Sequence, residues 1–147
     1  MKITVTPRPL LGDVCFIRHG AGFLGGSGDE HYLVVLIPDY DQSKSLVVGV
    51  VTSQIEKRIA AAKRNNFDPD TIVTIDPTEY KELRVKSAID CNSVKKLLKP
   101  YYDSITKDAI VCPQLPREII IRILNGIIKS DNVSDAIKNV AKNILPN

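Results

Sequence analysis

The sequence predicts an α+β fold, in which a small barrel of short strands is followed by helices. Two observations favour this fold. Between residues 12 and 92 the apolar residues form short runs separated by turn-forming residues, a pattern typical of short strands with short links. After residue 92 the apolar residues recur every three or four positions, which is typical of helices. We expect residues 1–147 to form a single domain.

Four runs rich in β-branched and aliphatic residues are the predicted strands. The second and third runs are separated by a turn-forming segment at 38–44, so we expect a hairpin of two antiparallel strands there. Short strands joined by short links predict a closed or nearly closed barrel. The four predicted strands lie at residues 14–17, 33–37, 46–51 and 71–75.

Helical spacing of apolar residues predicts one helix inserted among the strands and a C-terminal helical extension at about 116–145. The inserted helix is amphipathic, with basic residues on its polar face. Ser93 is suited to cap a further short helix, which we expect to end before Pro100 because proline disfavours helix in the preceding residue. The predicted helices lie at residues 53–65, 93–98, 116–129 and 131–145.

Charge and cysteine usage narrow the classes of function. The 20 Lys and Arg residues against 17 Asp and Glu give a net charge of +3, too small for a dedicated nucleic-acid coat protein but compatible with a basic face. The three cysteines form no Cys-x-x-Cys pair, so we expect no disulfide framework, no metal site and a reducing, cytoplasmic location. Because no apolar stretch of signal-peptide length follows the N-terminus, we predict neither secretion nor membrane insertion.

Residues 18–20 read Arg-His-Gly, a tripeptide that resembles the phosphate-binding motif of the histidine phosphatases. Those enzymes need a second histidine late in the sequence, whereas the other histidine here is the nearby His31. We therefore interpret the tripeptide as a coincidence at a strand end. Arg18 then lies at the mouth of the glycine-rich loop at 20–28, where it can touch a phosphate.

Several short motifs resemble those of the PemK/MazF family of toxins. Gly12-Asp13-Val14 is similar to the opening of the family, Thr52-Ser53-Gln54 to the end of its third strand, and residues 87–90 to its later Ser-x-Val/Ile strand. Residues 109–128 are similar to its last short strand and C-terminal helix, so the resemblance spans roughly 12–128. It implies an SH3-like barrel that forms a homodimer, cleaves single-stranded RNA without metal or cofactor, and is neutralised by an antitoxin in a type II toxin–antitoxin system.

The family's chemistry is attack of a ribose 2′-hydroxyl on the adjacent phosphate, which needs a proton acceptor and a cation near the phosphate oxygens. In typical members an Arg-Pro pair at the start of the second strand supplies the cation, near a threonine at the end of the third. Here Thr52 is retained and His31-Tyr32 takes the place of Arg-Pro. The resemblance therefore implies His31 and Thr52 as catalytic residues. Histidine suits proton transfer near neutral pH but lacks the permanent, bidentate charge of arginine.

Each candidate residue also has a structural interpretation, and both stay open. His31 equally suits a polar strand residue with a surface hydrogen bond, and Thr52 suits a cap for the helix that follows. The glycine-rich loop at 20–28 suits either a segment that orders over RNA or an antitoxin peptide, or a flexible hairpin connection. We predict RNA contacts from Arg18, Ser53 and Gln54, and from Lys57 and Arg58 unless these two basic residues only form a solvated helix face.

Two functional classes follow. The first is a PemK/MazF-like endoribonuclease, favoured by the retained Thr52. The second is a barrel of the same fold that has lost cleavage and binds a peptide or nucleic acid, favoured by the missing Arg-Pro pair. Growth arrest and RNA cleavage on expression would distinguish them.

Overall fold

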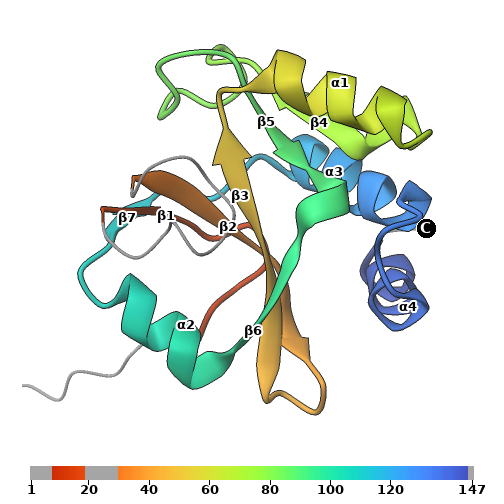
Figure 1. Cartoon of the computed structure of the whole chain (residues 1–147). Coiled ribbons are helices and arrows are strands. Elements are labelled where there is room, and N and C mark those ends of the chain that lie inside the picture. Colours follow the sequence, from red (N-terminus) through yellow and green to blue (C-terminus); the bar gives the residue numbers. More distant parts are fainter. Residues whose placement is uncertain (1–7, 19–29, 146–147) are drawn as a thin grey trace, which may run out of the picture.

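The computed structural model describes residues 8–18 and 30–145 (Figure 1). Within these residues a seven-stranded sheet and four α-helices form a mixed structure, so the predicted α+β class is confirmed. In the same segments no helix has the length and hydropathy that a membrane crossing requires. The strands are β1 (Val14–Ile17), β2 (His31–Tyr40), β3 (Ser45–Thr52), β4 (Ile72–Ile75), β5 (Ser87–Asp90), β6 (Lys95–Leu98) and β7 (Ile110–Cys112). The helices are α1 (Ile55–Arg64), α2 (Lys99–Thr106), α3 (Arg117–Lys129) and α4 (Asp135–Ile144), with short 3₁₀ helices η2 (Pro69–Thr71) and η3 (Cys91–Ser93).

The sheet is antiparallel and follows the order β4-β5-β3-β2-β1-β7, with β6 paired to β3 off this path. Among the described residues no pairing joins the outer strands β4 and β7, so the sheet is open where the sequence predicts a closed or nearly closed barrel. The reason is that β5 and β6, which precede and follow η3 in the chain, both pair with the same edge of β3. After β6 the chain forms α2 and returns to the edge of β1 as β7, so it adds no strand between β4 and β7.

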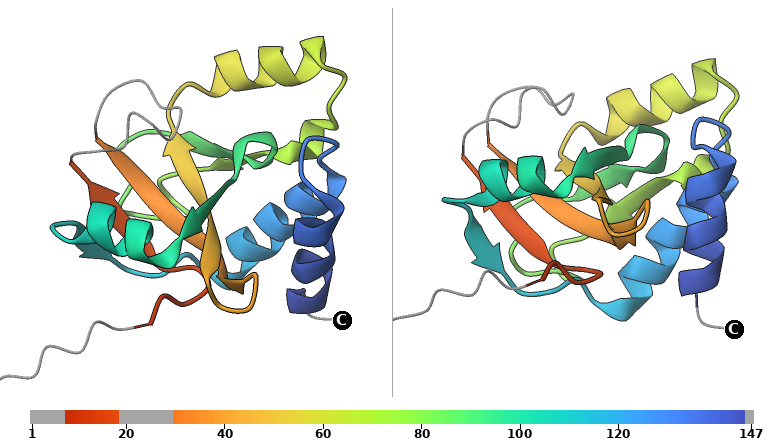
Figure 2. Two further views of the ribbon diagram at one scale, coloured as in Figure 1. Left: turned by 60° about the horizontal axis from the view of Figure 1, so that its bottom comes forward. Right: turned by 90° about the horizontal axis from the view of Figure 1, so that it is seen from below.

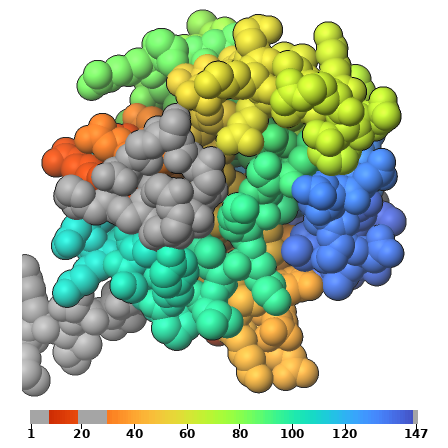
Figure 3. All heavy atoms as spheres, in the orientation of Figure 1, coloured from red at the N-terminus to blue at the C-terminus, as the bar shows by residue number. Residues whose placement is uncertain are grey.

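The predicted hairpin is formed by β2 and β3, with Val35 opposite Val48. Its turn is shorter than expected because β2 continues through Pro38 to Tyr40. Register shifts on both sides of Ile37 accommodate a proline that cannot donate a ladder hydrogen bond. Figure 3 shows this turn protruding from the body of the molecule at the bottom of the view.

Both faces of the central strands are buried. Val34 and Leu36 belong to a core that α3 and α4 complete. Leu33 and Val35 point to the other face and belong to a second core, which α2 covers. Burial on two faces explains why the run at 33–37 shows no alternation with polar residues.

The predicted inserted helix and C-terminal helices are confirmed. α1 lies on β4 and β5, where Ala62 packs in a cluster with Ile72 and Ala88. α3 begins directly after Pro116, and the Oγ of Ser134 caps α4 by accepting a hydrogen bond from the N–H of Ile137 at 3.3 Å. Figure 2 shows α3 and α4 side by side, across the sheet from α2.

The predicted helix at 93–98 is wrong. Residues 95–98 form β6, and the helix instead begins at Lys99, with Pro100 in its first turn. A free edge of β3 is available to pair with this segment, and the pairing overrides the local helical spacing. Proline is well tolerated in a first helical turn because its missing N–H would have no partner there.

Candidate functional site

A cavity of about 690 Å³ opens where the ends of β1, β2 and β3 meet. Because neighbouring strands are antiparallel, the end of β1 and the end of β3 both lie beside the start of β2. This topology brings five of the residues predicted from the sequence into the wall of one cavity. They are Arg18, His31, Thr52, Ser53 and Gln54.

His31 turns one ring nitrogen toward the backbone of β3. Its Nδ1 lies 3.5 Å from the carbonyl oxygen of Val51, which makes a long hydrogen bond. A carbonyl oxygen only accepts, so this bond requires the proton on Nδ1, and the neutral ring then carries its lone pair on Nε2. Nε2 is buried and has no hydrogen-bond partner among the residues that the structure describes. In this tautomer the ring has a lone pair on Nε2 that can accept a proton.

Thr52 is half-buried at the end of β3, and its Oγ1 accepts a hydrogen bond from the backbone N–H of Gln54 at 3.1 Å. The hydroxyl thus holds the turn before α1, although Gln54, not Thr52, is the N-cap residue of that helix. An accepting hydroxyl keeps its own proton for a further bond. Within 8–18 and 30–145, no acceptor for that proton is recorded, so a turn-holding role and a ligand contact are compatible.

A loop that the sequence analysis did not single out closes one side of the cavity. It follows β4 and contributes residues 82–85 to the lining. The hydroxyl of Tyr32 donates a hydrogen bond to the carbonyl oxygen of Glu82 at 2.9 Å, which ties the loop to β2 beside His31. The signal in the sequence is that Tyr80 and Leu83 are large apolar residues in an otherwise mostly polar segment. In the structure both are buried and hold the loop against the core.

Aromatic and sulfur groups line another wall of the cavity. The rings of Phe16 and Tyr32 have centroids 4.9 Å apart at an interplanar angle of 51°. Burial raises the pKa of the Tyr32 hydroxyl, the charges of Cys112 and Glu82 raise it further, and the charge of Arg84 acts against them. Burial also raises the pKa of the Cys112 thiol. Both groups therefore stay protonated at neutral pH.

Two permanent cations and two carboxylates share the cavity wall, namely Arg18, Arg84, Glu30 and Glu82. Among the described residues none of the four takes part in an ion pair. The same part of the chain contains no group of His, Cys, Asp and Glu side chains with the arrangement of a metal site. The cavity thus combines a proton acceptor, a hydroxyl donor and two guanidinium groups with two carboxylates. The first three kinds of group can act on a phosphodiester, whereas the carboxylates oppose its negative charge.

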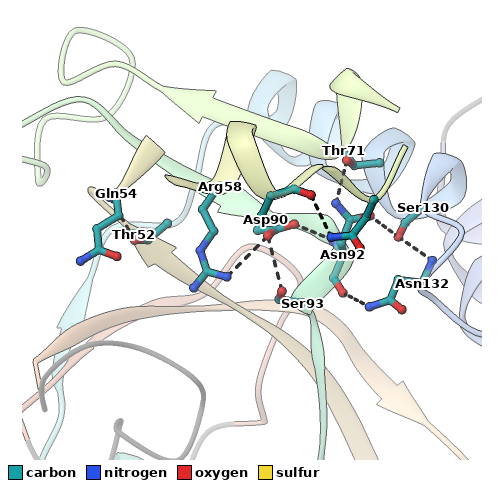
Figure 4. Close-up of polar contacts among 11 residues, drawn as sticks. Thr52, Gln54, Arg58, Thr71, Asp90, Asn92, Ser93, Ser130 and Asn132 are labelled. Atoms are coloured by element: carbon teal, nitrogen blue, oxygen red, sulfur yellow. Dashed lines mark hydrogen bonds and ion pairs between the residues drawn. The ribbon is translucent and has the colours of Figure 1, made fainter. Parts of the chain in front are cut away.

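The predicted RNA contacts on α1 do not line this cavity. Lys57 is exposed. Arg58 forms an ion pair with Asp90 (Figure 4), with 3.6 Å between the guanidinium and the carboxylate. It also borders a second cavity of about 310 Å³. Asp90 also accepts hydrogen bonds from the backbone N–H of Asn92 at 2.9 Å and from Ser93 Oγ at 3.4 Å. Arg58 is thus held at the end of β5 by Asp90, whereas Thr52 and Gln54 line the 690 Å³ cavity.

Asn92 is the centre of a buried polar network beside that second cavity (Figure 4). Its Nδ2 donates to the hydroxyl of Thr71 at 2.8 Å, and its Oδ1 accepts from the hydroxyl of Ser130 at 2.6 Å. Its carbonyl oxygen accepts from Asn132 Nδ2 at 2.8 Å. The network joins η2, η3 and the connection between α3 and α4, and because these groups satisfy one another it is structural.

His19 and the glycine-rich loop at 20–28 lie outside the described residues. The chain matches no protein-family model, and a search of curated proteins finds no match either.

Proposed function

We propose that the protein is a PemK/MazF-like endoribonuclease, the toxin of a type II toxin–antitoxin system, which cleaves single-stranded RNA in the 690 Å³ cavity. The observation that carries the proposal is that Arg18, His31 and Thr52 come from three strand ends and line one cavity. A proton acceptor, a hydroxyl and a cation in one wall are what metal-independent attack of a 2′-hydroxyl requires.

The proposal includes an SH3-like barrel. In support of it, β5 and β6 run antiparallel to β3 along successive parts of its length and are separated only by η3 and Val94. They can be regarded as one strand that bends at η3, and a bent strand of this kind is compatible with a partly open barrel.

In the proposed reaction His31 Nε2 removes the proton of a ribose 2′-hydroxyl. The 2′-oxygen then bonds to the adjacent phosphorus, the bond from phosphorus to the 5′-oxygen breaks, and that oxygen takes a proton from water. The hydroxide that remains takes the proton held by His31, which restores the neutral ring. The products are a 2′,3′-cyclic phosphate and a free 5′-hydroxyl. Thr52 donates a hydrogen bond to a phosphate oxygen, and Arg18, Ser53 and Gln54 bind the flanking RNA. Lys57 and Arg58 add attraction for the RNA along α1.

Two further parts of the proposal come from the resemblance alone: a second copy of the chain forms a homodimer, and an antitoxin peptide or protein blocks the cavity. A third part, that the protein acts in the cytoplasm, comes from its cysteine usage. The alternative function is a barrel without catalysis that binds a peptide or nucleic acid.

The test is growth after induced expression in a bacterial host, together with cleavage of single-stranded RNA by the purified protein. We expect growth arrest and cleavage with the wild type, and loss of both with His31→Ala and Thr52→Ala. Thr52→Ser keeps the hydroxyl and should retain cleavage, while Lys142→Ala, on the exposed side of α4, should behave as the wild type. Normal growth with intact RNA would rule out the nuclease and leave the binding barrel.

A further inference from the structure

We propose that Arg84, on the loop before β5, is the catalytic residue that holds the phosphate and neutralises its developing charge in the 690 Å³ cavity. This assignment rests on the proposed function. It concerns a residue that the sequence motifs do not mark.

The need for such a residue follows from the chemistry of the cavity. When a 2′-oxygen attacks phosphorus, negative charge builds up on the phosphate oxygens, and a nearby cation lowers the barrier. His31 must be neutral to take a proton at Nε2, so it does not supply this charge at the same time. Guanidinium groups are always charged and match two phosphate oxygens with parallel N–H donors. Among the described residues, Arg18 and Arg84 are the arginines that line the cavity.

The backbone on both sides of Arg84 is anchored near His31. Tyr32, the next residue after His31, donates its hydroxyl proton to the Glu82 carbonyl oxygen at 2.9 Å. Leu83 is only 5% exposed, so the residue before Arg84 is held in the core. Beyond it, the Ser87 hydroxyl bonds to the carbonyl oxygen of Val85 at 3.0 Å where β5 begins. A cation on this loop therefore needs little reordering to meet a phosphate.

The side chain of Arg84 is exposed and, within the described part of the chain, forms no ion pair. Arg58 and Arg122, by contrast, are paired with Asp90 and Glu79. The charge of Arg84 is also felt at the Tyr32 hydroxyl, where burial raises the pKa and Arg84 acts to lower it. Arg18 also lies near His31, because it follows Ile17, the strand partner of His31. Arg84 differs from Arg18 in standing on a loop whose backbone is held by hydrogen bonds on both sides.

The experiment compares single-turnover cleavage of a defined single-stranded RNA by the wild type and by Arg84→Gln, Arg84→Lys, Arg84→Ala and Arg18→Gln, with Arg117→Gln on α3 as an exposed control. Loss of one charge-stabilising donor typically costs about 10²–10³ in rate, and we expect that loss for Arg84→Gln and Arg84→Ala. Arg84→Lys should keep part of the rate, Arg18→Gln should lose clearly less than Arg84→Gln, and Arg117→Gln should match the wild type. Added guanidinium ion should restore part of the activity of Arg84→Ala, an effect that a purely structural role would not produce.

The outcomes separate this assignment from the proposed function. If the wild type cleaves and Arg84→Gln cleaves at the same rate, the assignment to Arg84 is overturned while the nuclease stands. If Arg84→Ala is slow but guanidinium does not restore it, Arg84 is structural and the assignment is also overturned. If the wild type does not cleave, the proposed function fails and the role of Arg84 with it. Thermal unfolding of each variant shows whether a lost rate reflects lost folding.

Discussion

Tyr32 is the residue that connects the candidate cavity to the loop carrying Arg84. Its ring packs against Phe16, with ring centroids 4.9 Å apart, and its hydroxyl holds the Glu82 carbonyl oxygen at 2.9 Å. The apolar and polar ends of the side chain therefore have separate functions, packing in one case and loop positioning in the other.

Tyr32→Phe removes the hydroxyl and keeps the ring. A typical hydrogen bond contributes about 1 kcal/mol, so we expect the free energy of unfolding to fall by about that amount. Because the loop loses its tie to β2, RNA cleavage should fall as well. Chemical denaturation and the cleavage assay measure the two effects. Tyr40→Phe is the control, since the Tyr40 hydroxyl has no hydrogen bond recorded among the described residues; equal effects of both variants would contradict the positioning role.

Part of this site is predictable from the sequence at the level of single residues. Thr52 and His31 are predicted from the motifs that resemble those of the PemK/MazF family, and antiparallel pairing of β2 with β3 brings the two residues together. Arg58 stands out for its charge, yet its partner is Asp90, which is distant in the sequence. Arg84 has no local pattern around it, since its place in the cavity depends on how a long connection folds back.

At the scale of elements, α3 packs very closely on the two 3₁₀ helices. Gly126 is the point of contact, and a Cβ placed there would lie 2.7 Å from Cys91 Sγ and 3.0 Å from the Asp70 carbonyl oxygen. Such distances are shorter than ordinary van der Waals contacts. The glycine is therefore explained by the approach of η2 and η3 to the helix.

Gly126→Ala is expected to lower the free energy of unfolding by about 1–3 kcal/mol, the usual cost of overpacking a core. This loss should appear even though alanine is favoured over glycine in a helix by about 1 kcal/mol. Urea denaturation measures it. In a Cys91→Ala background part of the loss should return, because the sulfur is gone while the Asp70 oxygen remains. The exposed neighbour Asn125→Ala should be close to neutral, and unchanged stability of Gly126→Ala would contradict the close packing.

At the scale of the whole molecule, two cores share the central strands. One lies between the sheet and α3 with α4, and the other lies under α2. Cys15 belongs to the second core, and burial, with smaller contributions from the charges of Cys112 and Asp13, raises the pKa of its thiol to about 11. Any change in the charge of this thiol therefore acts on the stability of the whole fold.

The pH dependence of stability follows from that shift. The unfolded chain releases the thiol proton near pH 9.0, whereas the folded chain keeps it up to about pH 11. The folded state thus keeps this proton in the window, and the contribution of Cys15 to the free energy of unfolding falls as the pH rises through it, by at most about 3 kcal/mol. The buried Cys91 thiol, whose pKa is also raised, adds to the total fall. Urea denaturation across this range should show a smaller fall for Cys15→Ala than for the wild type. Val48→Ala, a loss of volume in the same core, should keep the wild-type slope; parallel curves for Cys15→Ala and the wild type would contradict the prediction.

The sequence by itself determined the α+β class, four strands, the inserted helix and the C-terminal helices, because each depends on the spacing of apolar residues within one segment. Only the tertiary structure decided that 95–98 is a strand, since a free edge of β3 competes with local helical spacing. It also decided that the sheet stays open and that residues 82–85 join the cavity. These features depend on contacts between segments far apart in the chain, which no local period encodes.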